Sequence, residues 1–137
     1  MKWKAEYLLG IQKIDDEHDE LLKLISNVES ALEMQLESAI IHLVVLDLKR
    51  FATRHFDSEE TMMRAYGYKD IATHARAHLH FIKKLDEIDY HTLNGLAGRK
   101  QLLKYLREWF VSHLNGADRE YGDFVLKIDP MLGRALP

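Results

Sequence analysis

Residues 71–88 read IATHARAHLHFIKKLDEI, and this stretch carries two histidines at positions where an amphipathic helix normally carries apolar side chains. Apolar residues and histidines recur every three to four positions, at Ile71, His74, His78, Phe81, Leu85 and Ile88. This period is typical of a helix with one buried face. His74 and His78 lie one turn apart on that face. A buried polar group is costly unless something pairs with it, so the stretch predicts a helix that presents two imidazoles to a partner inside the fold.

The same period recurs in three further segments of the chain, over residues 14–32, 44–66 and 102–128. The joints between the four segments are short, so neighbouring helices are expected to run antiparallel. The sequence therefore predicts an all-α fold, an antiparallel up-down-up-down four-helix bundle over residues 1–128. Residues 1–12 are expected to form an N-terminal arm of that bundle. Residues 129–137 are expected to form a C-terminal tail outside the core.

Local signals predict where some of these helices begin and end. Asp15 or Asp16 is expected to cap the start of the first helix, because a carboxylate there accepts hydrogen bonds from unpaired backbone N–H groups. The second helix is expected to open near Ser38 and to end at Gly67. The only prolines are Pro130 and Pro137, both beyond the last segment.

The composition of the chain excludes several classes of protein. A chain of 137 residues with 47% hydrophobic and 30% charged residues is expected to fold as one domain with a real core. The formal net charge of −3 gives no basic surface for nucleic acid. No apolar run approaches the roughly 18 residues of a membrane span. The chain has no cysteine, which excludes disulfides and thiolate ligands. The first residues contain no apolar signal segment, so a cytoplasmic location is expected.

Seven residues that can bind metals fall on the predicted buried faces: His18, His55, Glu59, His74, His78, His113 and Asp118. A single inward histidine is most often a hydrogen-bonded core residue. Five histidines with two carboxylates are better explained by metal, and seven ligands are too many for one ion. The sequence therefore predicts a two-metal centre within the bundle.

The spacing of these residues raises one geometric question. His55 and Glu59 are four residues apart, like His74 and His78, and such pairs share a helix face. His113 and Asp118 are five apart, so a local π-type turn, helped by Gly116, is expected to bring both inward. Three other histidines, His42, His80 and His91, fall off the buried faces and are expected to face solvent. Met62 and Met63 are expected to serve in packing.

The types of ligand restrict the metal to a few candidates but do not identify it. Imidazole with carboxylate suits iron, zinc, manganese or copper. The zinc-protease pattern His-Glu-x-x-His is absent, and so is the Glu-x-x-His pair that helical di-iron carboxylate enzymes carry on two helices. A histidine-rich site donates less negative charge than a carboxylate-rich one. It is therefore expected to favour reversible binding over oxidation chemistry.

With these residues in view, the chain resembles a bacterial hemerythrin, a non-haem di-iron protein that binds dioxygen. The resemblance runs from Trp3 to about Tyr121. It rests on Gly10-Ile11, Ile14-Asp15-Asp16-Glu17-His18, His55-Phe56-Asp57-Ser58-Glu59-Glu60 with Met63, Tyr66-Gly67-Tyr68, His74-x3-His78 with Phe81, and Trp109-x3-His113-x4-Asp118. Two departures are visible. Glu17 stands where glutamine is usual, and Gly67 stands where proline is common.

The resemblance implies a division of the ligands between two iron ions. His74, His78 and His113 would bind one ion, and His18 and His55 the other. Glu59 and Asp118 would bridge both ions together with an oxo or hydroxo group. The second ion would then keep one open position for dioxygen as ligand.

The resemblance also implies that the chain is a carrier or store of dioxygen and not an enzyme. Two alternatives stay open: an oxygen or redox sensor that acts on an unidentified protein partner, and a di-iron enzyme that scavenges peroxide or nitric oxide. Trp109, Phe110 and Leu114 lie close to His113 along the predicted fourth helix. They are expected to form apolar walls of the oxygen pocket that exclude water.

Overall fold

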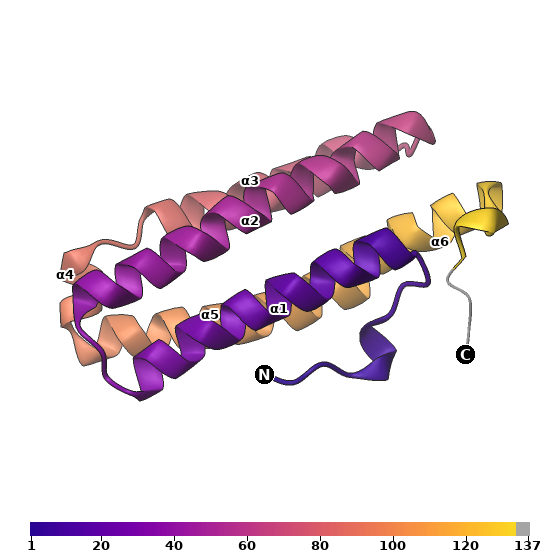
Figure 1. Ribbon diagram of the computed structural model, residues 1–137. Coiled ribbons are helices and arrows are strands. Elements are labelled where there is room, and N and C mark those ends of the chain that lie inside the picture. Colours follow the sequence, from indigo (N-terminus) through magenta and orange to yellow (C-terminus); the bar gives the residue numbers. More distant parts are fainter. Residues whose placement is uncertain (134–137) are drawn as a thin grey trace.

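The computed structural model describes residues 1–133 and shows the predicted antiparallel helical bundle (Figure 1). The four rods are α1 (Gln12–Glu33), α2 (Ser38–Ala65), α3 (Ile71–Asp86) and a last rod made of α5 (Leu96–His113), η2 (Leu114–Asp118) and α6 (Arg119–Ile128). Three short helices complete the described chain: η1 (Ala5–Tyr7), α4 (Tyr90–Asn94) and η3 (Pro130–Leu132). Sequence analysis did not predict α4, which lies between α3 and α5. Within residues 1–133, no helix is both long and apolar enough to cross a membrane.

The start of α1 differs from the prediction that Asp15 or Asp16 caps it. The helix begins at Gln12, and its N-cap position is Ile11, which makes no side-chain cap. Asp15 lies one turn further on. Its carboxylate accepts hydrogen bonds from the backbone N–H groups of Leu9 at 2.7 Å and Gly10 at 3.1 Å. The buried carboxylate of Asp15 therefore attaches the N-terminal arm to the bundle instead of capping the helix.

The end of α2 confirms the prediction for Gly67. Gly67 has a φ of +68°, a left-handed conformation that costs a side-chain-bearing residue energy. Its N–H donates to the carbonyl of Arg64, and the N–H of Tyr68 donates to the carbonyl of Met63. This is the Schellman arrangement, which satisfies the last carbonyls of a helix and turns the chain back toward α3.

The bundle has two apolar clusters. The large cluster, which includes Ile25, Leu48, Leu85 and Leu106, fills most of its length. The small cluster lies at the end where the arm meets α6, and its buried members are Leu9, Ile11, Ile14, Met63, Tyr68, Tyr121 and Val125. On each of the four rods, the predicted ligands lie between residues of one cluster and residues of the other. The fold therefore places a polar layer between two apolar ones.

The last residues of the N-terminal arm and the C-terminal end of the described chain lie against the small cluster. Arg119 on α6 donates hydrogen bonds to the backbone carbonyls of Glu6 and Leu8 in the N-terminal arm. Leu132 of η3 contacts the small cluster, and an isolated β-bridge joins Ile11 to Gly133. Residues 134–137 of the predicted tail lie outside the described residues. The division into a bundle over residues 1–128 and a tail over 129–137 stays a prediction.

Candidate metal centre

The structure brings all seven sequence-predicted residues together in the polar layer. Each has at most 8% of its surface exposed. Their nitrogen and oxygen atoms form two overlapping groups, within each of which the candidate ligand atoms lie within 4.8 Å of one another. The first group contains Glu59, His74, His78, His113 and Asp118, and the second contains His18, His55 and Glu59. Two adjacent positions for ions therefore share a carboxylate.

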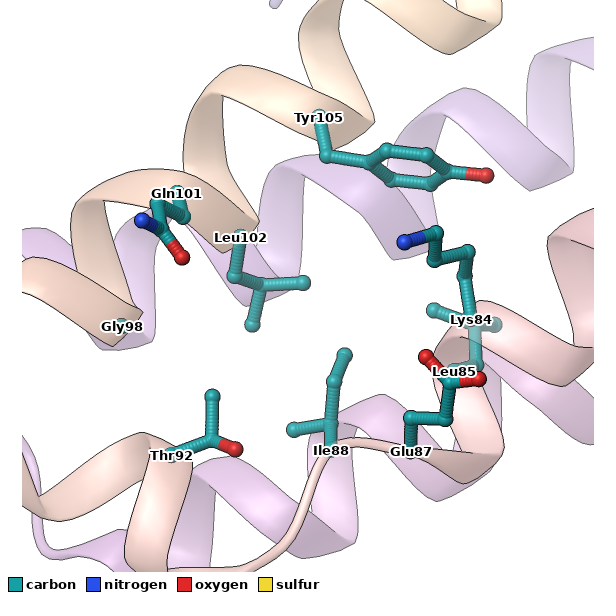
Figure 2. A pocket seen from close by; sticks show the side chains of 9 residues that line it. All are labelled: Lys84, Leu85, Glu87, Ile88, Thr92, Gly98, Gln101, Leu102 and Tyr105. Atoms are coloured by element: carbon teal, nitrogen blue, oxygen red, sulfur yellow. The ribbon is translucent and has the colours of Figure 1, made fainter.

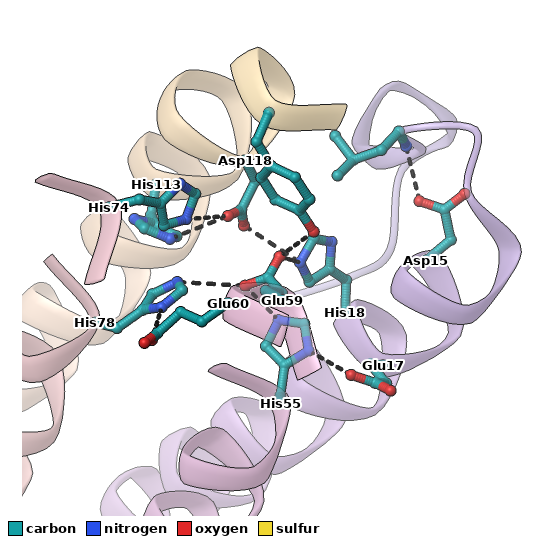
Figure 3. Close-up of polar contacts among 12 residues, drawn as sticks. Asp15, Glu17, His18, His55, Glu59, Glu60, His74, His78, His113 and Asp118 are labelled. Atoms are coloured by element: carbon teal, nitrogen blue, oxygen red, sulfur yellow. Dashed lines mark hydrogen bonds and ion pairs between the residues drawn. The ribbon is translucent and has the colours of Figure 1, made fainter. Parts of the chain in front are cut away.

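Asp118 connects the two groups as well (Figure 3). Its Oδ1 atom lies 2.9 Å from Nε2 of His74 and 3.1 Å from Nε2 of His113. Its Oδ2 atom lies 3.2 Å from Nε2 of His18, which belongs to the second group. One oxygen of this carboxylate faces each group, as a bridging ligand requires.

Glu59 also stands between the two groups, but its oxygens are divided between the imidazoles in a different way. Its Oε1 atom lies 3.1 Å from Nε2 of His55 and 3.3 Å from Nε2 of His78, which come from different groups. Its Oε2 atom lies 3.3 Å from Nε2 of His18. The two carboxylates thus stand between the same two sets of imidazoles.

The π-type turn expected between His113 and Asp118 is confirmed. Residues Leu114–Asp118 form the π-helical segment η2, which places the two side chains on the same side of the rod although they are five residues apart. The expected help from Gly116 is not needed. The backbone φ of Gly116 is not positive, and an added Cβ would meet no atom within 4 Å.

The polar atoms at the centre of the layer meet the requirements of a metal site. Buried atoms without a hydrogen-bond partner include Oε1 of Glu59 and the Nε2 atoms of four imidazoles, those of His18, His55, His78 and His113. Each such atom costs on the order of 1–3 kcal/mol when nothing pairs with it. They converge on the same place, and imidazole nitrogen with carboxylate oxygen is a donor set that suits iron and other transition metals. The residues therefore fit a pair of metal ions.

Two further carboxylates hold the outer sides of the imidazoles (Figure 3). Nδ1 of His55 lies 2.8 Å from Oε1 of Glu17, and Nδ1 of His78 lies 2.9 Å from Oε2 of Glu60. An imidazole that donates its Nδ1 proton outward keeps the lone pair of Nε2 free to face inward. The sequence pattern alone did not assign this role to Glu17 and Glu60. The signal that could have indicated it is that each is adjacent in sequence to a candidate ligand, Glu17 to His18 and Glu60 to Glu59.

The metal-free centre is a compact set of opposite charges. Burial lowers the pKa of His18, but the negative charges of Asp118 and Glu59 close to its ring outweigh this effect and raise the pKa to about 10. Burial also lowers the pKa of His55, but Glu59 and Glu17 outweigh burial and raise the pKa to about 9. Burial raises the pKa of Glu59, yet its histidine neighbours hold the pKa well below its usual value. Without metal, protons occupy these imidazoles, so metal must displace them.

Aromatic rings cover the outer faces of two imidazoles. Trp109 stacks on His113, with ring centroids 4.8 Å apart and planes 11° apart. Phe56 stacks on His78 at 3.9 Å and 5°, a contact that sequence analysis missed. Phe110 and Leu114, the other two predicted wall residues, are buried in the large cluster. Phe56 and Trp109 thus place apolar surface directly against two imidazoles of the polar layer.

Three histidines outside the predicted buried faces were expected to face solvent, and this is confirmed for two of them. His80 and His91 are exposed. His42 is half-buried, and its ring stacks on Tyr90 of α4 with centroids 5.3 Å apart. The prediction that His42 faces solvent was wrong because the sequence pattern did not reveal α4, which covers this position.

A surface cavity of about 290 Å³ lies away from the polar layer and is lined by none of the seven residues (Figure 2). Lys84, Leu85, Glu87 and Ile88 line it from the α3 end, and Gln101, Leu102 and Tyr105 from α5. Burial raises the pKa of Tyr105 to about 12. The candidate centre is therefore an enclosed polar layer and not the open cavity.

The fold and this layer together define a helical protein with a histidine-rich candidate site for two metal ions. The family model described as the hemerythrin HHE cation binding domain matches residues 9–125. The chain therefore belongs to the hemerythrin family.

Individual relatives agree with this assignment. The chain is 33% identical to bacteriohemerythrin of Clostridium acetobutylicum, over 88% of this chain and 98% of that protein. It is 28% identical to bacteriohemerythrin of Stenotrophomonas maltophilia, over 90% of this chain and 80% of that protein. Among solved structures, a crystal structure of wild-type hemerythrin superimposes with a TM-score of 0.76 at 23% identity, covering 90% of this chain and 95% of that one. This last likeness confirms the all-α bundle.

Proposed function

We propose that this chain binds dioxygen reversibly at a pair of iron ions, as a carrier or store of oxygen. The observation that carries the proposal is the convergence of unpartnered Nε2 and carboxylate oxygen atoms in two groups that share Glu59. Membership of the hemerythrin family supports iron as the metal and dioxygen as the ligand. When bound, a ferrous pair supplies the electrons that dioxygen takes up and returns.

The two ions would be held by different numbers of imidazoles. His74, His78 and His113 would hold one ion, and His18 and His55 the other. Glu59 and Asp118 would bridge them, because each carboxylate lies close to imidazoles of both sets. The second ion would be held by one imidazole fewer than the first, which would leave room for the gas ligand.

The side chains around the layer would exclude water and hold protons in place. Glu17 and Glu60 keep the Nδ1 protons of His55 and His78 on the outside. Trp109, Phe110 and Leu114, which we propose as walls of the oxygen pocket, surround the layer with apolar surface. Water and anions would be poorly solvated there, so bound oxygen would leave as neutral dioxygen. No side chain needs to act as a general acid or base, which supports a carrier over an enzyme.

A cycle of oxygen exposure and removal tests this function. Ferrous protein prepared without oxygen is exposed to oxygen, recorded by visible spectroscopy, degassed and recorded again. The proposal expects a new absorption band with oxygen that disappears on degassing, over several cycles. Direct conversion to a stable ferric spectrum would contradict reversible binding. Turnover of hydrogen peroxide or nitric oxide by the same sample would favour the enzyme alternative.

A further inference from the structure

The buried ring of Tyr121 reaches the polar layer although it is not one of the seven predicted ligands. Tyr121 lies on α6, one turn after Asp118, and its surface is fully buried. Its hydroxyl donates a hydrogen bond of 2.5 Å to Oε2 of Glu59. Its ring also packs edge-on against His74, with centroids 5.3 Å apart. One side chain thus contacts a carboxylate from α2 and an imidazole from α3.

We infer that Tyr121 is a positioning residue, which holds Glu59 in its bridging orientation and withdraws electron density from it. The inference rests on the proposed function, because it concerns the carboxylate that would be shared by both ions. Packing alone does not explain a tyrosine here. A phenylalanine would fill the same space in the small cluster without a hydroxyl to bury.

The orientation of Glu59 follows from where the hydroxyl binds. The bond to Tyr121 occupies Oε2, while Oε1 has no hydrogen-bond partner and lies between His55 and His78. Rotation of the carboxylate would break a buried hydrogen bond to a charged group. The phenol therefore keeps Oε2 directed at His18 and Oε1 directed at His55 and His78.

The electronic effect has a definite sign. A donated hydrogen bond stabilises negative charge on Glu59 and weakens its donation to a bound metal. The reduced, less positive state of the metal pair is then favoured over the oxidised state. Removal of the hydroxyl is therefore expected to favour the oxidised state.

The test compares Tyr121→Phe with the matched control Tyr68→Phe. Tyr68 belongs to the same cluster, and its ring lies 6.4 Å from that of Tyr121, but its hydroxyl is not among the groups that bond to Glu59 in the described chain. We expect Tyr121→Phe to shift the balance of reduced to oxidised iron about tenfold toward oxidised, or about 59 mV for a one-electron couple. It should also change the visible spectrum of the Co²⁺-loaded protein. Tyr68→Phe should change neither.

The same experiment separates failure of this inference from failure of the proposed function. If the folded, iron-loaded Tyr121→Phe protein has the potential and the Co²⁺ spectrum of the unmodified protein, Tyr121 only packs. If the unmodified protein holds no iron pair, the proposed function itself fails.

A measurement on the unmodified protein covers the case in which the variant does not fold. In the Zn²⁺-loaded protein, proton NMR should show one downfield, slowly exchanging phenolic proton with a contact to the ring of His74. Absence of that proton would overturn the inference.

Discussion

At the scale of single residues, two of the imidazoles have ring nitrogens with different surroundings. In His55 and His78 the outer Nδ1 faces a carboxylate, while the inner Nε2 has no hydrogen-bond partner. This difference would orient the two imidazoles as metal donors. It would also give Glu17 and Glu60 an influence on a bound metal without contact with it.

Glu17→Gln tests this influence. An amide accepts the Nδ1 proton of His55 without a negative charge, so the imidazole becomes a weaker donor and the oxidised metal is stabilised less. We expect the oxygen-bound iron protein to convert to the ferric form about tenfold more slowly, at the lower end of the roughly 10- to 100-fold effects that partners of metal ligands have. Stopped-flow absorbance measures this rate.

The matched control for that experiment is Glu20→Gln, an exposed change of the same chemistry on α1. It should leave the conversion rate unchanged. Equal rates for Glu17→Gln and the unmodified protein, with iron content intact, would show that the contact between Glu17 and His55 does not tune the metal.

At the scale of elements, sequence patterns predicted what depends on spacing. The period of apolar residues predicted the four rods, and the five-residue interval from His113 to Asp118 predicted the π-helical segment η2. The patterns failed where tertiary contacts decide. Asp15 binds the N-terminal arm instead of capping α1, because the arm folds back along the bundle. The stacking of Phe56 on His78 likewise depends on how α2 and α3 pack.

The residues of the candidate site could likewise be predicted where their spacing along the chain was sufficient, but not where tertiary contacts decide. The seven candidate ligands could be recognised because each occupies a buried position of a periodic helix. Tyr121 lies in the same apolar period, and the spacing does not distinguish it from a core residue. Its bond to Glu59 depends on the distance between α6 and α2, which no spacing along the chain reveals.

Two glycines at helix junctions give a prediction at this scale. Gly67 has a positive φ, so Gly67→Ala is expected to destabilise the protein by about 1 kcal/mol. Gly116 lies in η2 with free space around it and no positive φ, so Gly116→Ala should be neutral or stabilise by up to about 1 kcal/mol. Urea unfolding measures both changes. Loss of metal in Gly116→Ala would show that η2 does depend on glycine.

At the scale of the whole molecule, the charges of the polar layer couple folding to pH. His18 and His55 have pKa values raised to about 10 and about 9, from 6.5. Their contribution to stability is complete below pH 6.5 and is lost as pH rises through 9 and 10. Glu59 and Asp118 have lowered pKa values, so their contribution is present above their ordinary values and is lost as pH falls. Metal binding has the opposite dependence on alkaline pH, because it requires neutral imidazoles.

The metal-free protein should therefore melt at a lower temperature at pH 10 than at pH 6.5. The rise in Tm on adding Zn²⁺ should be larger at pH 8.5 than at pH 6. Scanning calorimetry with chelator or with Zn²⁺ measures both quantities. His80→Gln removes an exposed histidine and should leave the pattern unchanged. A metal-free Tm that stays level or rises between pH 6.5 and pH 10 would contradict the charge arrangement described for the layer.

The proposed centre requires that seven side chains from all four rods hold two metal ions. Anaerobic titration of ferrous iron into the metal-free protein, followed by gel filtration and elemental analysis, measures how many ions the chain retains. We expect two iron atoms per chain in the unmodified protein. We expect fewer than two in His78→Ala and the full two in His80→Ala, which changes an exposed histidine two residues away on the same helix. Retention of one iron or none by the unmodified chain, or equal retention by the two variants, would contradict the proposed centre.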